Sequence, residues 1–289
     1  DDGSPGPNHE WMDEAIKWCR YYLQGVDNGT RREMSKGKQL TAFVRAGHEP
    51  DTALAEAPGK WRRFNWPVQN GSWLKLYPAV DNRLARSCRR AAKDRLEYTP
   101  GSGMAAGIWW GDSTGDMSAD DAGCLVYDSG KLLKPIQIVG TPKVCLKVEA
   151  SARQATWAVR LEDVSPSGKV SLVTGALANS SHREDRLAPS LVEPNQPYSL
   201  AIDLNFTTWT FKPGHRIRLA VGNAQFPMAW PNAEPMTVTL HTGVSQTSLA
   251  LPVVPPKAGK ALRLPKVSAK LESPHGHDID LGAEKPAVK

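Results

Sequence analysis

The sequence predicts a mainly β protein whose principal unit is an antiparallel jelly-roll β-sandwich. The first reason is that many short segments alternate apolar and polar residues, the pattern of strands with one buried face. The second is that Pro, Gly and Asn turns separate these segments, as they do in all-β sandwiches. The segment 141–150 shows the alternation most clearly. Its predicted inward residues are Val144, Leu146, Val148 and Ala150, and its outward residues are Lys143, Cys145, Lys147 and Glu149.

Later segments repeat the alternation and extend the predicted sandwich over residues 96–254. The inward faces we predict are Trp157, Val159 and Leu161; Tyr198, Leu200, Ile202 and Leu204; Ile217, Leu219 and Val221; Val238 and Leu240; and Leu249, Leu251 and Val253. Beyond Pro255 the chain is rich in Pro, Lys and Gly and has no hydrophobic period. We therefore expect residues 255–289 to be a linker or a disordered tail.

The first part of the chain has a different pattern. An apolar stripe at helical spacing predicts a helix over residues 9–24, and Gly25 stands where a left-handed C-terminal cap is wanted. The stripe consists of Trp11, Ala15, Trp18, Cys19 and Tyr22. A strand over residues 40–46 follows, with Leu40, Ala42 and Val44 on one face.

A single helix and strand do not make a domain. We therefore interpret residues 1–47 as the last piece of an α/β domain whose remainder is missing, and residues 48–95 as a connector with a strand at 73–77. The chain starts at Asp1 rather than Met, so we expect it to be a part or a processed form of a longer product.

The composition excludes several classes of function. The net charge is +6, but the basic segment 83–95 has no interleaved aromatic residues and no nucleic-acid motif, so we expect no nucleic-acid partner. No stretch is long and apolar enough for a transmembrane helix, so we expect no membrane partner. The four cysteines have neither metal-ligand nor redox spacing. We expect buried free thiols and leave one disulfide open among Cys19, Cys88, Cys124 and Cys145.

One motif suggests catalysis. The run Gly111-Asp112-Ser113-Thr114-Gly115 fits G-x-S-x-G, the turn that holds the nucleophile of many hydrolases. That motif needs a buried strand before it and a helix after it, whereas residues 116–121 have no helical apolar stripe. We interpret the match as coincidental. A hydrolase that uses Ser113 remains an alternative, which labelling by a fluorophosphonate would reveal.

Other polar residues in the sandwich are interpreted structurally. An acidic cluster, Asp112, Asp116, Asp120 and Asp121, lacks the spacing of a calcium loop, so we expect a solvated loop and no bound metal. We expect His182, His215 and His241 to be structural or surface residues, because each lies on or beside a predicted strand.

The segment Ile108-Trp109-Trp110 is the candidate binding feature. Neighbouring residues on a strand point to opposite faces, so one of the two tryptophans is exposed or lies at an interface if the segment is extended. The alternative is that one ring packs in the core and the other lies beneath a loop.

The order and spacing of several motifs resemble the C-terminal part of X-Pro dipeptidyl-peptidase and cocaine-esterase-like serine hydrolases. The resemblance extends over nearly the whole chain to about Val254. It rests on segments 13–18 and 22–29, on Trp61-Arg62 with Trp66-Pro67, on 109–112, 120–123 and 125–129, on 160–168, and on 207–221 followed by 223–227.

The resemblance implies a jelly-roll, galactose-binding-like sandwich preceded by a helix–strand remnant of an α/β-hydrolase domain. In this family the catalytic Ser, acid and His all belong to the α/β domain. The resemblance therefore implies no catalytic residue, metal or cofactor in this chain. The implied partners are the missing α/β-hydrolase domain and a small acyl, ester or peptide substrate.

The implied role is a non-catalytic domain that packs on the catalytic domain and shapes the acyl pocket. Ile108, Trp109 and Trp110 are then the predicted substrate-binding residues. The alternative is a free-standing jelly-roll binding module for carbohydrate or another ligand, with exposed Trp side chains as its ligand surface.

Overall fold

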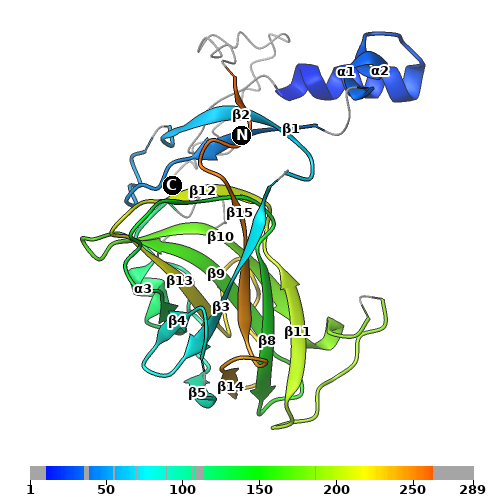
Figure 1. Cartoon of the computed structure of the whole chain (residues 1–289). Coiled ribbons are helices and arrows are strands. Elements are labelled where there is room, and N and C mark those ends of the chain that lie inside the picture. The colour runs from blue at the N-terminus through cyan, green and yellow to red at the C-terminus, as the bar shows by residue number, and fades with distance from the viewer. Residues whose placement is uncertain are drawn as a thin grey trace, which may run out of the picture.

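The computed structural model describes residues 11–35, 39–54, 56–68, 70–88, 90–105, 107, 114–185 and 187–262. Two layers of strands face each other across one apolar core (Figure 1). The layers are joined by β3 (Ser72–Ala79). Its first residues pair with β15 (Ser248–Val254) and its last with β4 (Arg83–Ala85). The prediction of a mainly β protein is confirmed.

One layer continues from β4, whose pairing with the next strand is parallel, through antiparallel strands to the edge strand β10. Its order is β4, β6 (Cys124–Asp128), β13 (Arg216–Gly222), β9 (Thr156–Val164) and β10 (Val170–Asn179). The other layer runs from β3 and β15 through β8 (Lys143–Ala150) and β14 (Thr237–Thr242) to β5 (Ala92–Glu97). β11 (Tyr198–Asp203) pairs with β8, and β7 (Ile136–Gly140) pairs with β12 (Thr207–Phe211) and β15.

The remaining elements lie at the ends of these layers. A separate three-stranded sheet contains β1 (Gln39–Arg45), β2 (Gly59–Asn65) and β16 (Lys260–Ala261). The helices are α1 (Trp11–Gln24), α2 (Thr30–Met34), the short α3 (Ser118–Asp121) and the 3₁₀ turn η1 (Ser180–His182). Within the described residues, none of these helices is long and apolar enough to cross a bilayer.

The period-2 alternation placed the core strands correctly. In β8 the four residues predicted to face inward are buried, and Leu146 and Val148 pack among the large buried rings of Trp157 and Trp209. The inward residues predicted for β13 and β14 are also buried. Burial of this apolar face, at roughly 25 cal/mol per Å², is the main term that stabilises the sandwich.

Strand β9 departs from the alternation. Every residue after Thr156 is buried, including Arg160 and Glu162 on the face opposite the apolar core. The reason is that helix α3 lies against this outer face, where Asp121 pairs with Arg160. The strand is therefore covered on both sides, and its polar residues are buried with it.

The strand after the first helices is fixed to the sandwich by Arg45. Its guanidinium donates to the carbonyls of Thr208 and Val173 and lies 4.9 Å from the ring centroid of Trp209. Burial lowers the pKa of Arg45 to about 10. Next to it, an added Cβ on Gly47 would stand 2.7 Å from the carbonyl oxygen of Thr210. Only glycine permits this approach.

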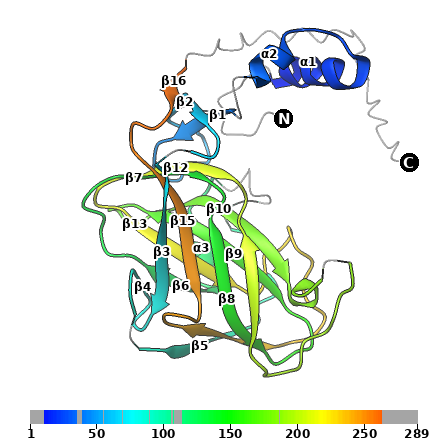
Figure 2. The same ribbon diagram turned by 45° about the vertical axis from the view of Figure 1, so that its right-hand side comes forward.

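The helical hairpin of α1 and α2 stands beside β1 and β2, away from the sandwich, in both views (Figures 1 and 2). The helix predicted over residues 9–24 is confirmed over its described part, and Gly25 has the expected left-handed φ of 68°. Lys17 and Glu33 join the two helices by a 2.9 Å ion pair.

The cysteines correct one expectation. All four are free thiols, as predicted, but Cys19 and Cys145 are exposed rather than buried. Cys145 is one of the outward residues of β8, and Cys19 lies on a helix that the sandwich does not cover. Burial raises the pKa of the half-buried Cys124 to about 11.

Candidate functional site

A buried ionic cluster lies on the outer face of β9, next to helix α3. Arg160 is its centre and is 1% exposed. Its Nε donates to Glu162 Oε1 at 2.7 Å, one terminal nitrogen donates to Asp121 Oδ1 at 2.7 Å, and the other donates to Gln225 Oε1 at 2.9 Å. These contacts tie strand β9, helix α3 and the loop after β13 to one guanidinium.

Arg218, on the neighbouring strand β13, extends the cluster toward the surface. It donates to Asp121 Oδ2 at 2.7 Å and forms a two-pronged contact with Asp128 at 2.6 and 2.9 Å. Arg216 also lies 3.9 Å from the carboxylate of Asp128. Asp121 and Asp128 thus each have two guanidiniums nearby, whereas Glu162 has only that of Arg160 among the described residues.

The most deeply buried carboxyl group of the cluster is that of Glu162, which is fully buried. Its Oε2 atom has no hydrogen-bond partner among the described residues. Burial raises the pKa of Glu162 to about 8, because desolvation outweighs the attraction of Arg160.

Hydrogen bonds to two aspartates hold described residues on both sides of positions 108–113. Asp120 Oδ1 accepts from the backbone N–H groups of Gly103 and Ala105, at 3.2 and 3.0 Å. On the far side, Asp116 Oδ1 accepts from the N–H of Val170 at 3.1 Å.

The prediction of a solvated acidic loop is wrong for Asp120 and Asp121, whereas Asp116 is exposed as predicted. Asp120 and Asp121 are 5% and 6% exposed and lie in the short helix α3, which the sequence pattern did not predict. They are buried because the N–H groups and guanidiniums around them satisfy their charge. Among the described residues, no three His, Cys, Asp or Glu side chains are placed to hold a metal ion.

The predicted binding residues Ile108, Trp109 and Trp110 lie outside the described residues, as do Gly111, Asp112 and Ser113. Their role remains a prediction. Described residues on either side of them, Gly103, Ala105 and Asp116, take part in the hydrogen bonds given above.

Histidine 215 is a structural residue, as predicted. Its Nδ1 lies 2.8 Å from Asp163 Oδ1, and the other oxygen of Asp163 accepts from Trp209 Nε1 at 2.8 Å. The group is buried where β9, β12 and β13 meet the segment after β1. His241 is likewise paired, at 2.6 Å, with Glu149.

A second candidate surface is the apolar face of α1. Trp18, Tyr22 and Leu23 are 54%, 48% and 81% exposed, although they belong to a helix with a strong apolar stripe. Trp18 and Tyr22 stack with their ring centroids 4.4 Å apart, and Tyr22 contacts Met34 of α2. A contiguous apolar surface of this kind marks a contact with another protein surface.

We expect the isolated chain to self-associate through this helix. Replacing Trp18 by Lys should raise the dissociation constant by about tenfold or more, because burial of one large apolar side chain contributes roughly 1.5–3 kcal/mol. Sedimentation equilibrium measures the change. Trp73→Lys is the matched control, since Trp73 is 53% exposed on strand β3. Equal effects of the two substitutions would contradict the assignment to α1.

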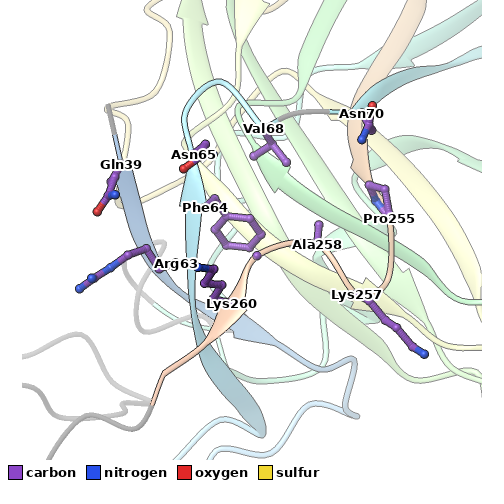
Figure 3. Close-up of a pocket in the computed structure, with 11 residues that line it drawn as sticks. Gln39, Arg63, Phe64, Asn65, Val68, Asn70, Pro255, Lys257, Ala258 and Lys260 are labelled. Atoms are coloured by element: carbon purple, nitrogen blue, oxygen red, sulfur yellow. The ribbon is translucent and has the colours of Figure 1, made fainter. Parts of the chain in front are cut away.

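A third feature is a cavity of about 550 Å³ between β2 and the turn before β16. Phe64, Val68 and Ala258 line its wall, and its cations are Arg63, Lys257 and Lys260. The side chains of Arg63 and Lys257 point away from each other (Figure 3), so they do not converge on one ligand position. The cavity therefore lacks the geometry of an anion site.

Comparison with known families and proteins agrees with this picture of a non-catalytic sandwich. Residues 36–262 match the family described as the X-Pro dipeptidyl-peptidase C-terminal non-catalytic domain. Helices α1 and α2 lie before this match. A Mycobacterium bovis protein named as a serine esterase is 24% identical over 88% of this chain and 43% of its own length. Cocaine esterase from a Rhodococcus species is 33% identical over 37% of this chain and 18% of its own length.

Solved structures show the same fold. An aminopeptidase from a marine Thaumarchaeota archaeon superposes with a TM-score of 0.62 at 19% identity, over 85% of this chain and 44% of that one. A CocE/NonD family hydrolase from Staphylococcus aureus gives a TM-score of 0.60 at 14% identity, over 84% of this chain and 45% of that one. The chain therefore spans less than half the length of these proteins.

Proposed function

Because the chain belongs to the X-Pro dipeptidyl-peptidase C-terminal non-catalytic domain family, we propose that it packs on the catalytic domain of a serine hydrolase and shapes its acyl pocket. The partner would be an α/β-hydrolase domain N-terminal to the sandwich, and the substrate a small ester, amide or peptide. The names of the similar proteins, an esterase and an aminopeptidase among them, agree with acyl chemistry of this kind.

The observation that carries the proposal is the exposed apolar face of α1. This helix precedes the residues that match the family, and Trp18 and Tyr22 have no apolar cover from the sandwich. An α/β-hydrolase domain would supply that cover, so that α1 and α2 form its last helical part. The assignment of residues 1–47 to such a domain is part of this proposal.

The buried ionic cluster would hold the start of the segment that contains Ile108, Trp109 and Trp110. Asp120, Asp121 and Gln225 connect residues 102–105 to strand β9 through Arg160. A segment that starts from so firm a base can present side chains to a neighbouring domain at a defined position. We assign the role of pocket wall to Ile108, Trp109 and Trp110, which follow this base in the sequence.

The test is a pair of substitutions in the longer protein that carries the catalytic domain. Trp109→Ala and Trp110→Ala should raise KM for 4-nitrophenyl acyl esters by about three- to tenfold, because each removes apolar contact with the acyl group. The control is Trp73→Ala, since Trp73 lies on strand β3 outside the segment. Unchanged KM and unchanged acyl-chain preference in both variants would contradict the assignment.

A further inference from the structure

An exposed tryptophan stands on a firmly held loop between β13 and β14. Trp230 is 84% exposed, although tryptophan is among the residues that proteins bury most on average. The ring of Phe226 packs against the Trp230 ring in an edge arrangement, with the two ring centroids 6.2 Å apart. The N–H of Phe226 donates to Ser102, and Tyr98 Oη donates to the carbonyl of Asn232 at 3.2 Å. The exposed ring is therefore presented on a rigid base.

The ring borders a cavity of about 430 Å³, a size suited to a small ligand. Most of the other side chains that line it are polar and planar at their ends. They are Arg153, Gln154, Asn179, Asn232 and Glu234. The pocket therefore combines one aromatic platform with several groups that form directional hydrogen bonds.

The amide groups in this pocket are oriented by their neighbours. Asn232 Oδ1 accepts from Thr156 Oγ1 at 3.3 Å, and Asn179 Oδ1 accepts from the N–H of Ser181 at 2.9 Å. Within the described part of the chain these oxygens hold both amides, which leaves the two Nδ2 groups to donate to a ligand. Gln154 donates to Asn179 at 3.4 Å and so offers its own Oε1 as an acceptor.

From this arrangement we propose that the pocket around Trp230 is a binding site for a neutral saccharide. A sugar ring presents an apolar C–H face, which packs on an indole, and hydroxyl groups, each of which can donate and accept. The pocket supplies the platform together with both donors and acceptors. Its single cation, Arg153, is balanced by Glu234, so it has no net charge to favour a phosphate or a carboxylate.

The proposed sugar site lies at the opposite end of β9 from the residues that contact the segment after β1. Thr156 and Asn179 are partners at the start of β9, whereas Asp163 and Ser171 mark the other end, where Ser171 contacts His48. Seven residues of extended strand separate Thr156 from Asp163, which is about 23 Å. Sugar binding can be measured on the chain alone and needs no enzymatic activity.

Saturation-transfer NMR on the full 289-residue chain tests the proposal. The probes are glucose, galactose, mannose, cellotriose, maltotriose and mannotriose. Adenosine is the control ligand, because its planar base can stack on an indole without the C–H face of a sugar. At least one saccharide should receive saturation at its ring C–H protons. Its dissociation constant should rise about tenfold or more in Trp230→Ala and less in Trp230→Phe, which keeps an aromatic face.

Two controls separate a local effect from a general one. Trp73→Ala removes a tryptophan that is 53% exposed elsewhere and should leave binding unchanged. Circular dichroism should show an intact fold for Trp230→Ala, because the removed ring is mostly in solvent. The proposal is overturned if no saccharide of the panel binds, if adenosine alone binds, or if Trp230→Ala binds sugar as well as the parent chain does.

Discussion

Replacing Arg160 by Met should lower the free energy of unfolding by about 3–5 kcal/mol, the usual cost of removing one partner from a buried ion pair. The side chain is 1% exposed and compensates Glu162 and Asp121 directly. Without it, the carboxylate of Asp121 keeps only Arg218, and Gln225 loses the donor to its Oε1. Urea denaturation of the purified chain measures the loss.

Arg216→Met is the matched control for this prediction. Arg216 lies on the same strand as Arg218 and is an arginine too, but its side chain is 42% exposed and its ion pair with Asp128 is 3.9 Å long. Its loss should cost less than about 1 kcal/mol. A loss for Arg160→Met no larger than this would contradict the account of the cluster.

Glu162→Gln separates the role of the Arg160 guanidinium from that of the buried Glu162 carboxyl group. The folded state holds the Glu162 proton up to about pH 8, whereas the unfolded chain releases it near the ordinary pKa of 4.5. Its contribution to stability is therefore present below pH 4.5 and is lost as the pH rises through about 8. The glutamine side chain resembles the protonated acid, so the variant should be about as stable as the parent near pH 4 and should be the more stable of the two as the pH rises toward 8.

The second large effect concerns catalysis. The isolated chain should not react with a fluorophosphonate, because serine hydrolysis needs a nucleophile activated by a base and an oxyanion hole. Three described histidine rings have partners other than a serine hydroxyl: His48 lies against the carbonyl of Ala46, His215 against Asp163 and His241 against Glu149. Gel fluorescence of the labelled chain, beside a known serine hydrolase, measures the reaction.

Ser113→Ala is the control that identifies the source of any signal. Labelling of the parent chain that disappears in this variant would establish the alternative, a hydrolase that uses the G-x-S-x-G run. Equal absence of signal in both proteins is the result expected for a non-catalytic domain.

Much of the sandwich could be predicted from the sequence because its strands carry their own signal. In β8 one face is apolar and the other polar, so the alternation alone places Val144 and Lys143 on opposite sides. The helix α1 was predicted for the same reason, since its stripe requires no knowledge of what covers it. The period of the apolar residues predicts an apolar face, and each of these elements has one such face.

The buried cluster could not be predicted in this way. Arg160 and Asp121 are 39 residues apart, and each looks like an ordinary surface residue until the other is placed beside it. The acidic pair Asp120-Asp121 was therefore assigned to solvent. A signal was present in β9, where Arg160, Glu162 and Asp163 interrupt an apolar strand, but the sequence does not say which cations and carboxyl groups pair.

The pocket around Trp230 was also missed, for a different reason. The run Ala229-Trp230-Pro231-Asn232 lies in a loop without periodicity. Its partners Gln154 and Asn179 come from the neighbouring ends of β9 and β10, and only the register of those two strands brings them together. Sites made from loop residues are the part of a protein that patterns along the chain predict least well.

The most direct test of the central claim is the intact mass of the native product, together with its fluorophosphonate reactivity. The account predicts a product of roughly twice the 31.5 kDa of this chain or more, since the chain matches 43% of a related esterase, with a reactive serine outside residues 1–289. A native product that begins near Asp1 and does not react would contradict it. The chain would then be a free-standing binding protein, and Trp230 would mark the surface to study first.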